Sequence, residues 1–309
     1  MRVAVVGSTG YLGSRIVRSL LAAPDVELVV GVGRRPTYSE ERHPKFRYVQ
    51  AVLPRASLGA LFDAHQISTV VHLVFISRPT HSNLEAYRSN VAGTAAVFTA
   101  ATASCVPHAV LVSSVAVYGP RAAAEPAVEN DKPLPNAFQF SMHKLLQEQA
   151  AAAATTGGPT TLTVLRPCTV VGPAVHNFLV DLLRRPLVPI PRGADPRWQF
   201  LHEDDFSNSL LHVLRTKTGG IFNLVPDDAI HLREALRRWG SRPVSVPGPL
   251  LAAVTATGWL MRWPVVPAPP SALPFLCGSV VASNRFIREA LHIQFRYTSA
   301  EAADTLTRR

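Results

Sequence analysis

Near the amino end the sequence reads Val5-Val6-Gly7-Ser8-Thr9-Gly10-Tyr11-Leu12-Gly13, at the end of a short apolar run. In a strand–turn–helix unit, Gly7 permits a tight turn, Gly10 lets the backbone approach a pyrophosphate and Gly13 lets the helix pack closely. The amides that open such a helix bind an anion, and the helix dipole strengthens the binding. The stretch therefore predicts that residues 7–13 cradle the phosphates of a dinucleotide, with a purely structural turn as the alternative.

Short apolar, β-branched runs alternate with helical patterns through the first two-thirds of the chain. The predicted strands are residues 3–6, 28–32, 46–49, 69–73, 109–112 and 162–165. They are apolar on both faces, as strands of a parallel sheet covered on both sides are. Apolar stripes at spacings of three and four mark two intervening helices, at residues 12–21 and at Leu84, Tyr87, Val91, Ala95 and Phe98. The alternation predicts an α/β fold, a Rossmann-type doubly wound parallel sheet with right-handed crossovers.

After residue 173 proline becomes frequent and the pattern changes. We expect residues 1–173 to form the Rossmann dinucleotide-binding domain. Residues 174–309 are expected to form mainly a smaller, mixed α/β substrate-binding region, from which residues 198–225 return to the sheet.

The carboxyl-terminal third contains helical patterns at residues 203–214 and 232–239. Residues 243–274 are rich in proline, which predicts that no long regular element forms there. Within them, residues 250–263 are compatible with an amphipathic helix against a membrane or a partner. A wall of the substrate cleft or a packed surface helix is the favoured interpretation.

Composition excludes several classes of protein. Hydrophobic residues make up 47% of the 309 residues and charged residues 17%, which excludes a disordered chain. The net charge is +10, from 31 basic and 21 acidic residues. Because no basic block is longer than a pair, we expect no nucleic-acid partner, and the charge favours anionic ligands.

The cysteines predict neither a disulfide framework nor a metal site. Cys105, Cys168 and Cys277 lie far apart and form no CxxC pair, and the histidines have no metal-ligand spacing. The chain opens without the pattern of a signal peptide, and its longest apolar stretch is shorter than the roughly 20 residues of a membrane span. We therefore expect a cytoplasmic protein without stable membrane insertion.

Four later segments, like the glycine spacing of residues 7–13, match motifs of one known family. They are Asn90-Val91-Ala92-Gly93-Thr94, Val112-Ser113-Ser114-Val115-Ala116-Val117-Tyr118-Gly119, residues 165–173 and residues 200–205. Together, and in this order, they resemble the extended short-chain dehydrogenase/reductase family, the NAD(P)-dependent epimerases and dehydratases. The resemblance covers most of residues 1–225 and implies a small hydroxylated or carbonyl substrate. Many relatives are homodimers through helices equivalent to residues 83–103 and 136–154.

The resemblance also implies which residues contact the cofactor. Beyond residues 7–13 these are Leu73, Val74, Asn90, Lys144, Pro167 and Val170. NAD-binding members place a carboxylate after the second strand, where this chain has Arg34 and Arg35. Guanidinium groups match a phosphate bidentately, so NADP(H) is favoured over NAD(H). Val52 stands where relatives carry an aspartate for adenine, which leaves backbone contact alone to hold that ring.

The family's reaction uses a serine or threonine, a tyrosine and a lysine four residues later. The matching positions are Ser114, Phe140 and Lys144. Ser114 is expected to hold the substrate oxygen, and Lys144 to bind the nicotinamide ribose. A phenyl ring fits the tyrosine position but cannot transfer a proton, a loss worth typically about 10²–10⁴-fold in rate. The catalytic centre is therefore predicted to be altered, with severely slowed turnover.

Two side chains are candidates to replace the missing proton donor. His143 titrates in a useful range, with a solvated helix-face histidine as the favoured alternative. Tyr118 is ordinarily structural or in contact with substrate in this family. The leading hypothesis is an NADP(H)-binding oxidoreductase, epimerase or dehydratase. The alternative is a non-redox protein that uses the inherited cleft as a nucleotide sensor, a partner-binding module, a cyclase or an isomerase.

Overall fold

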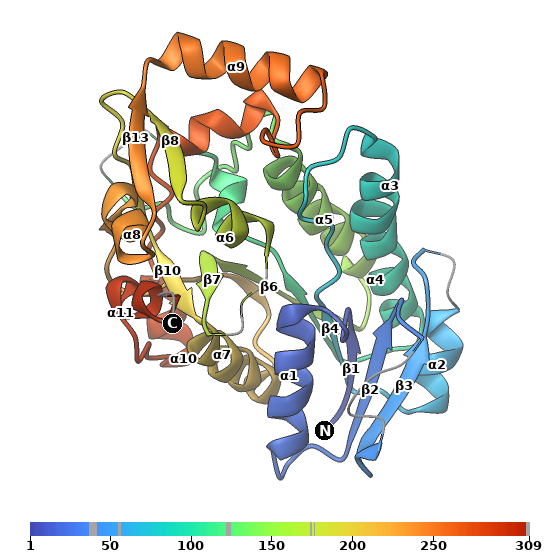
Figure 1. Ribbon diagram of the computed structural model, residues 1–309. Helices are drawn as coiled ribbons and strands as arrows, with labels where there is room; N and C mark the ends of the chain where they lie inside the picture. The colour runs from blue at the N-terminus through green and yellow to red at the C-terminus, as the bar shows by residue number, and fades with distance from the viewer. Residues whose placement is uncertain (37–41, 55–56, 122–124, 174, 176, 307–309) are drawn as a thin grey trace.

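The computed structural model describes residues 1–36, 42–54, 57–121, 125–173, 175 and 177–306. Within them, seven parallel strands form one sheet in the order β11-β6-β5-β4-β1-β2-β3 (Figure 1). The strands are β1 (Arg2–Val6), β2 (Leu28–Gly33), β3 (Phe46–Gln50), β4 (Thr69–His72), β5 (His108–Val112), β6 (Thr161–Pro167) and β11 (Gly220–Leu224). Each predicted strand is present, and the doubly wound α/β fold is confirmed.

The strand order places the glycine-rich turn at the point where the direction of winding reverses. From β1 the chain adds β2 and β3 on one side, and then β4, β5 and β6 on the other. Val6, the last residue of β1, pairs with Val32 of β2 and His72 of β4. Ligands of open parallel sheets bind at the carboxyl ends of the strands near such a reversal. The turn at residues 7–10 leaves the sheet there.

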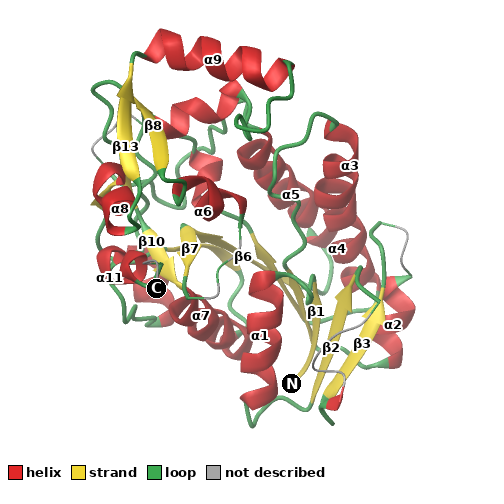
Figure 2. Ribbon diagram, in the orientation of Figure 1, coloured by secondary structure: helices red, strands yellow, loops and turns green. Residues whose placement is uncertain are grey.

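Helices cover both faces of the sheet (Figure 2). One face packs against α1 (Tyr11–Ala22), α7 (Glu203–Thr216) and α10 (Arg285–Leu291). The other packs against α2 (Leu58–Ala64), α4 (Gly93–Ala103) and α5 (Gln139–Thr155). Because successive strand side chains point to opposite faces, Val110 of β5 joins the first core and Leu111 the second. This arrangement explains why the strands are apolar at consecutive positions.

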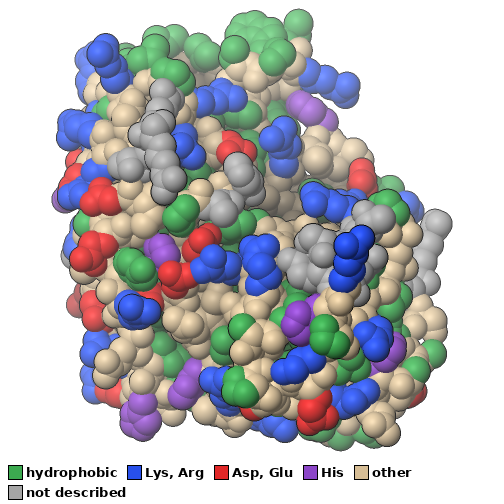
Figure 3. All heavy atoms as spheres, turned by 60° about the horizontal axis from the view of Figure 1, so that its bottom comes forward, with side chains coloured by type: hydrophobic (Ala, Val, Ile, Leu, Met, Phe, Trp, Pro, Cys, Tyr) green, Lys and Arg blue, Asp and Glu red, His purple; other side chains and the backbone are tan. Residues whose placement is uncertain are grey.

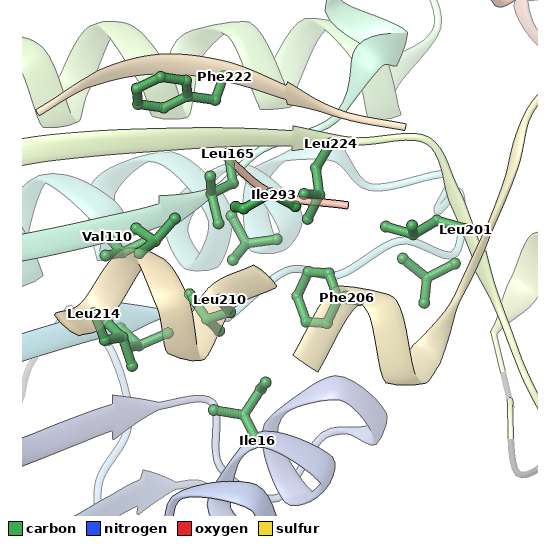
Figure 4. Packing of buried hydrophobic residues seen from close by; sticks show 14 of the residues in the cluster. Ile16, Val110, Leu165, Leu201, Phe206, Leu210, Leu214, Phe222, Leu224 and Ile293 are labelled. Atoms are coloured by element: carbon green, nitrogen blue, oxygen red, sulfur yellow. The ribbon is translucent and has the colours of Figure 1, made fainter. Parts of the chain in front are cut away.

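The first core holds the carboxyl-terminal part of the chain to the sheet. Figure 4 shows Ile16 of α1 and Leu210 and Leu214 of α7 packed below Val110 and Leu165 of the sheet. All five side chains are fully buried. Burial of each such side chain contributes about 1.5–3 kcal/mol, so this face fixes α7 firmly against the sheet.

The smaller region lies beyond the carboxyl ends of the strands, around a third core that contains Phe200 and Trp239. Three short strand pairs build it: β7 (Thr169–Val171) with β10 (Phe200–His202), β8 (Leu187–Pro191) with β13 (Arg242–Val246), and β9 (Arg197–Trp198) with β12 (Ile230–His231). Its helical segments are α6 (Phe178–Leu183), α8 (Leu232–Arg238), α9 (Gly248–Leu260), η4 (Pro270–Leu276) and α11 (Ser299–Asp304). Two elements that lie between these in the sequence belong to the large sheet: α7 packs on its first face and β11 pairs with β6.

The proline-rich segment contains a regular helix, so the expectation for residues 243–274 is wrong. α9 has 13 residues, and its proline, Pro249, lies in the first turn. Amides of the first turn have no acceptor within the helix, so the missing N–H of proline costs no helical hydrogen bond. The next proline is Pro264, after the helix has ended. Of the residues that the structure describes, no helix is both long and apolar enough to cross a bilayer.

The predicted apolar stripe from Leu84 to Phe98 is correct only in its second half. The segment consists of α3 (Asn83–Tyr87), the π-helical turn η2 (Arg88–Ala92) and α4. A π turn holds more residues than an α turn and rotates the face that follows. Consequently Leu84 and Tyr87 are exposed, whereas Val91 and Phe98 are buried.

Candidate functional site

The turn at residues 7–13 has the geometry of a phosphate cradle. Gly7 adopts a φ of +98°, and its amide donates to the Val32 carbonyl at 2.8 Å. A Cβ atom at Gly13 would lie 2.0 Å from the Gly7 carbonyl oxygen, so only glycine allows α1 to approach this closely. The residue before α1, Gly10, has no side chain to cap the first-turn amides. These amides therefore have no side-chain cap, and an uncapped helix start with its dipole is an arrangement that suits an anion.

The loop after β4 forms a second wall of the cradle. A Cβ atom at Gly7 would lie 3.0 Å from the amide nitrogen of Val74 and 3.1 Å from the carbonyl carbon of Leu73. Asn90, in the π-helical turn, fixes this loop by accepting from the Ile76 amide at 2.7 Å and donating to the Ile76 carbonyl at 3.2 Å. The structure thus brings Leu73 and Val74 against the cradle, whereas the Asn90 side chain holds the loop.

Arg34 and Arg35 follow β2 at the same edge, and both are exposed. Their backbone carbonyls accept hydrogen bonds from β3, from Gln50 Nε2 at 3.1 Å and from the Tyr48 hydroxyl at 2.6 Å. The backbone is therefore held while the guanidinium groups reach into solvent. Val52 is 53% exposed and lines an open groove of about 340 Å³. The groove is lined by Val49, Gln50, Ala51, Val52, Ser57, Leu58 and Leu61.

Lys144 lies in a nearly closed environment beside β5. Its Nζ atom donates to the Val112 carbonyl at 2.8 Å and lies 4.1 Å from the centre of the Phe75 ring. Burial lowers the pKa of the Lys144 ammonium to about 7, although the Glu148 carboxylate acts in the opposite direction. Ser114 follows the end of the same strand and is half-buried. Its hydroxyl accepts a hydrogen bond from the Ala116 amide at 3.2 Å.

Phe140 belongs to a cluster of aromatic rings. Its ring meets Phe75 edge to face, with 5.0 Å between centroids, and lies 6.3 Å from Phe138, which in turn contacts Phe275. Phe75 is thus a common neighbour of Phe140 and of the Lys144 ammonium. No hydroxyl is present at this position.

His143 and Tyr118 are both committed to internal contacts. His143 is 2% exposed, its Nδ1 lies 3.3 Å from the Asn90 amide nitrogen, and its ring packs against Tyr87. The interpretation of His143 as a solvated helix-face residue is therefore wrong, because α5 turns this side chain toward the π-helical turn. Burial lowers the pKa of His143. The Tyr118 hydroxyl donates to Asn223 at 2.8 Å, and burial raises its pKa.

A buried ion pair connects α5 with β6 beneath the site. Arg166 binds both carboxylate oxygens of Glu148, at 2.9 and 2.6 Å, and its third nitrogen donates to the Tyr118 hydroxyl at 2.7 Å. Ser113 donates to the same carboxylate. The network ties Ser113, next to the candidate Ser114, to the helix that carries Lys144.

Pro167 and Val170 are buried at the junction of the two regions, where Val170 pairs with Leu201 of β10. Tyr11 of the cradle also reaches this junction, because its hydroxyl donates to the Glu203 carboxylate. Arg15 forms ion pairs with Glu203, at 3.2 Å, and with Asp204. The first turns of α1 and α7 are thereby joined beside the cradle.

A cavity of about 390 Å³ opens between the loop after β4, α6 and the end of α9. Three arginines line it, and the His81 and Trp259 rings stack at its rim with 4.0 Å between centroids. The lining residues are Arg78, Pro79, His81, Phe178, Asp181, Leu182, Arg185, Trp259, Arg262, Trp263, Pro264, Val266 and Pro267. Because Asp181 is the one carboxylate among them, the cavity favours an anionic ligand.

Residues 3–224 match the family model of the NAD dependent epimerase/dehydratase family. The chain belongs to this family. The match spans the cradle, Ser114, Phe140 and Lys144, and it extends to the last strand of the sheet. Among the described residues, histidine, cysteine and carboxylate side chains form no cluster of three or more that is able to hold a metal ion.

Relatives of this chain include proteins of known and unknown activity. An uncharacterized Mycobacterium tuberculosis protein is 29% identical over 254 residues, which cover 80% of this chain and 68% of that protein. The UDP-glucose 4-epimerase of Erwinia amylovora is 31% identical over 159 residues, about half of each chain. The family assignment therefore rests on the family model.

Solved structures of similar fold bind NAD. MoeE5 in complex with UDP-glucose and NAD has a TM-score of 0.75 and 25% identity, over 99% of this chain and 97% of the other. The dTDP-glucose 4,6-dehydratase of Bacillus anthracis, in complex with NAD, has a TM-score of 0.77 and 16% identity, over 99% and 95% of the two chains. Both are epimerase/dehydratase-like folds that hold the dinucleotide.

Several residues around the site carry little or no signal in the sequence. Glu148 follows Lys144 by one helical turn, a spacing that indicates a shared helix face, and Arg166 interrupts an apolar strand. Phe75 had no such signal, because an aromatic residue after a buried strand is ordinary. The three arginines of the cavity come from distant segments that only the fold brings together.

Proposed function

We propose that the chain binds NADP(H) and acts as an epimerase, dehydratase or related oxidoreductase on a sugar that carries a phosphate or diphosphate group. The observation that carries the proposal is the closeness of Gly7 and Gly13, because this approach leaves no room for a side chain and exposes amides to an anion. The residues present therefore fit the pyrophosphate of a dinucleotide.

Residues 7–13 would hold that pyrophosphate, with Leu73 and Val74 beside it. Arg34 and Arg35 would bind a 2′-phosphate, and the groove beside Val52 would take the adenine through backbone contacts. The nicotinamide, when bound, supplies or accepts a hydride. Guanidinium groups at the end of β2, without a carboxylate, support NADP(H) over NAD(H).

Ser114 and Lys144 are the proposed catalytic residues. The Ser114 hydroxyl would hold the substrate oxygen, and Lys144 would bind the ribose hydroxyls after its Nζ atom leaves the Val112 carbonyl. Phe140 excludes water and positions the substrate but transfers no proton. A water molecule would supply that proton, since His143 is buried against Asn90 and Tyr87, and this predicts slow turnover.

The arginine-lined cavity is the proposed substrate site. Arg78, Arg185 and Arg262 offer planar donors that match phosphate oxygens, and Trp259 and Trp263 offer flat apolar surfaces. UDP-sugars bound to MoeE5 motivate the choice of test substrates. We therefore use UDP-glucose and UDP-glucuronic acid as the first probes of this site.

The experiment measures NADPH and NADH binding by calorimetry, and then product formation by chromatography together with NADPH absorbance. Phe140→Tyr is expected to raise turnover by about 10²–10⁴-fold, because it restores a proton donor. Phe138→Tyr is the matched control, since it adds the same hydroxyl to the neighbouring ring. The proposal is wrong if neither nucleotide binds, or if Phe140→Tyr stays at background with every sugar and carbonyl compound tested.

A non-redox function is the second candidate, supported by the position of Phe75 over Lys144 and beside Phe140. The Phe75 ring, through these two contacts, would fill space that a reacting group needs beside Lys144. Tight NADPH binding without turnover in either variant would favour a nucleotide sensor. Absence of nucleotide binding would favour a cyclase, an isomerase or a partner-binding module.

We also propose a homodimer through the helices at residues 83–103 and α5. Leu84, Tyr87 and Met142 are exposed apolar side chains on these helices. Sedimentation should show a dimer that Leu84→Glu weakens, and a monomer at all concentrations would refute it.

A further inference from the structure

α9 and the turn after it carry an exposed apolar face, most of which lies outside the proposed substrate cavity. The helix buries only Leu251, Thr255 and Gly258 against the rest of the described structure. We call the remaining large apolar side chains from this helix and the following turn the α9 face. They are Leu250, Val254, Leu260, Met261, Trp263 and Val265.

The α9 face is unusually open for a set of large hydrophobic residues. Leu260 is 79% exposed, Val265 71% and Met261 63%. Contiguous exposed apolar patches on soluble proteins generally mark an interaction site. In Figure 1, α9 forms the outer edge of the smaller region, and Figure 3 shows hydrophobic side chains gathered along that upper edge with basic side chains beside them.

The charges beside the α9 face are mostly positive, and Asp181 of α6 is the one carboxylate that lines the adjoining cavity. Between Glu234 and Glu289 the sequence contains no aspartate or glutamate, whereas it contains several arginines. Arg262 lies within the face itself, between Met261 and Trp263. Arg185 joins it from α6, since its guanidinium donates to the Val265 carbonyl at 2.9 Å. Arg242, the exposed first residue of β13, donates from its amide to the carbonyl of Pro186, the residue after Arg185, at 2.9 Å.

We propose that the α9 face docks the protein on the surface of a bilayer that contains anionic lipids. Its apolar side chains would enter the boundary between headgroups and acyl chains, Arg242 would contact lipid phosphates, and the charges of Arg185 and Arg262 at the cavity would add to the attraction. Trp263, at the border between apolar and basic groups, has the amphipathic character of interfacial tryptophans. A helix of 13 residues is too short to span the membrane but long enough to lie in its surface.

The charge complementarity favours a lipid surface over a second copy of the chain. Two copies facing each other through α9 would bring the arginines of both chains together without an acidic residue from this segment to pair with them. An anionic bilayer neutralises the same arginines. Docking in this way would place the membrane beside the arginine-lined cavity, which shares Arg262 and Trp263 with the α9 face.

The test is flotation of the full chain with extruded vesicles, either of phosphatidylcholine alone or of phosphatidylcholine mixed with phosphatidylglycerol. We expect binding to the mixed vesicles and much weaker binding to the neutral ones and at high salt. The double variant Leu260→Glu/Met261→Glu should lower the bound fraction at least about tenfold, because it removes two apolar contacts and adds two negative charges. Leu134→Glu, at a side chain that is 66% exposed and outside the face, is the matched control and should bind as the parent does.

Circular dichroism and NADPH binding check that the double variant is folded, since neither Leu260 nor Met261 lines the cavity or the cradle. Failure of the parent protein to bind mixed vesicles overturns the proposal, as does equal binding by the parent and the folded double variant. Sedimentation supplies a third decisive result. If the double variant dissociates a dimer and the parent ignores vesicles, the α9 face is an interface between copies.

Discussion

The Nζ atom of Lys144 lies 4.1 Å from the centre of the Phe75 ring. The ring covers a cation that also donates to the Val112 carbonyl, so the amine is shielded from water on several sides. The pKa of Lys144 is lowered to about 7 by this burial. A lysine that loses its charge near neutral pH links the stability of the fold to pH.

We expect the stability of the protein to rise with pH above about 7 through Lys144. In this range the unfolded chain keeps the lysine protonated while the folded chain releases the proton, so unfolding takes up a proton. Below about 7 both states are protonated, and the cost of burying the ammonium is fully present. The gain is at most about 1.4 kcal/mol per pH unit.

Urea unfolding of the parent protein and of Lys144→Met between about pH 6 and pH 9 measures this effect. The free energy of unfolding of the parent should rise relative to that of the variant as pH increases. Lys132→Met, at an exposed lysine, is the control and should follow the parent. Parallel profiles for the parent and Lys144→Met would contradict the expectation.

Gly13→Ala should destroy the phosphate cradle. The new Cβ atom would lie 2.0 Å from the Gly7 carbonyl oxygen, so α1 must move away from the turn. We expect NADPH affinity to fall at least about tenfold and the melting temperature to fall by several degrees. Calorimetry and thermal unfolding measure the two effects.

Gly59→Ala is the matched control for Gly13→Ala. Its Cβ atom would lie 3.5 Å from the Ser104 hydroxyl, an ordinary contact, and the change within α2 should slightly stabilise the protein. Unchanged NADPH binding in Gly13→Ala would show that the turn does not hold the cofactor.

Arg34→Ala and Arg35→Ala should each weaken NADPH binding while leaving NADH binding unchanged. A charged hydrogen bond to a phosphate is worth about 1.5–3 kcal/mol, which corresponds to a Kd about 10–100 times higher. Arg47→Ala, at an exposed arginine on the neighbouring strand, is the control. If both nucleotides lose affinity equally, these arginines do not select the 2′-phosphate.

Glu148→Gln should destabilise the protein strongly. The substitution leaves Arg166 charged and buried without its carboxylate, which typically costs about 3–5 kcal/mol. Glu234→Gln breaks an exposed pair with Arg238 on α8 and should change the free energy of unfolding little. Urea unfolding compares the two variants, and similar small losses would mean that water reaches the Glu148–Arg166 pair.

The sequence alone determined the sheet and the cradle. Strands buried on both faces need apolar residues at consecutive positions, and a helix that approaches a turn within van der Waals contact needs glycine. Short stretches of sequence are therefore enough to predict both features. Ser114, Phe140 and Lys144 were recognisable through the resemblance of their segments to the family's motif. The π-helical turn at Arg88–Ala92 was not recognisable, because its apolar spacing differs from that of a regular helix by a single residue.

Only the tertiary structure decided what surrounds those positions. Phe75 meets Lys144 and Phe140 because the loop after β4 crosses above α5, and Arg78, Arg185 and Arg262 share a cavity because α6 and α9 face that loop. The exposure of the α9 face could not be predicted either, because apolar residues such as those of α9 are ordinarily buried. Contacts between segments distant along the chain depend on how the whole fold closes, and no local pattern encodes them.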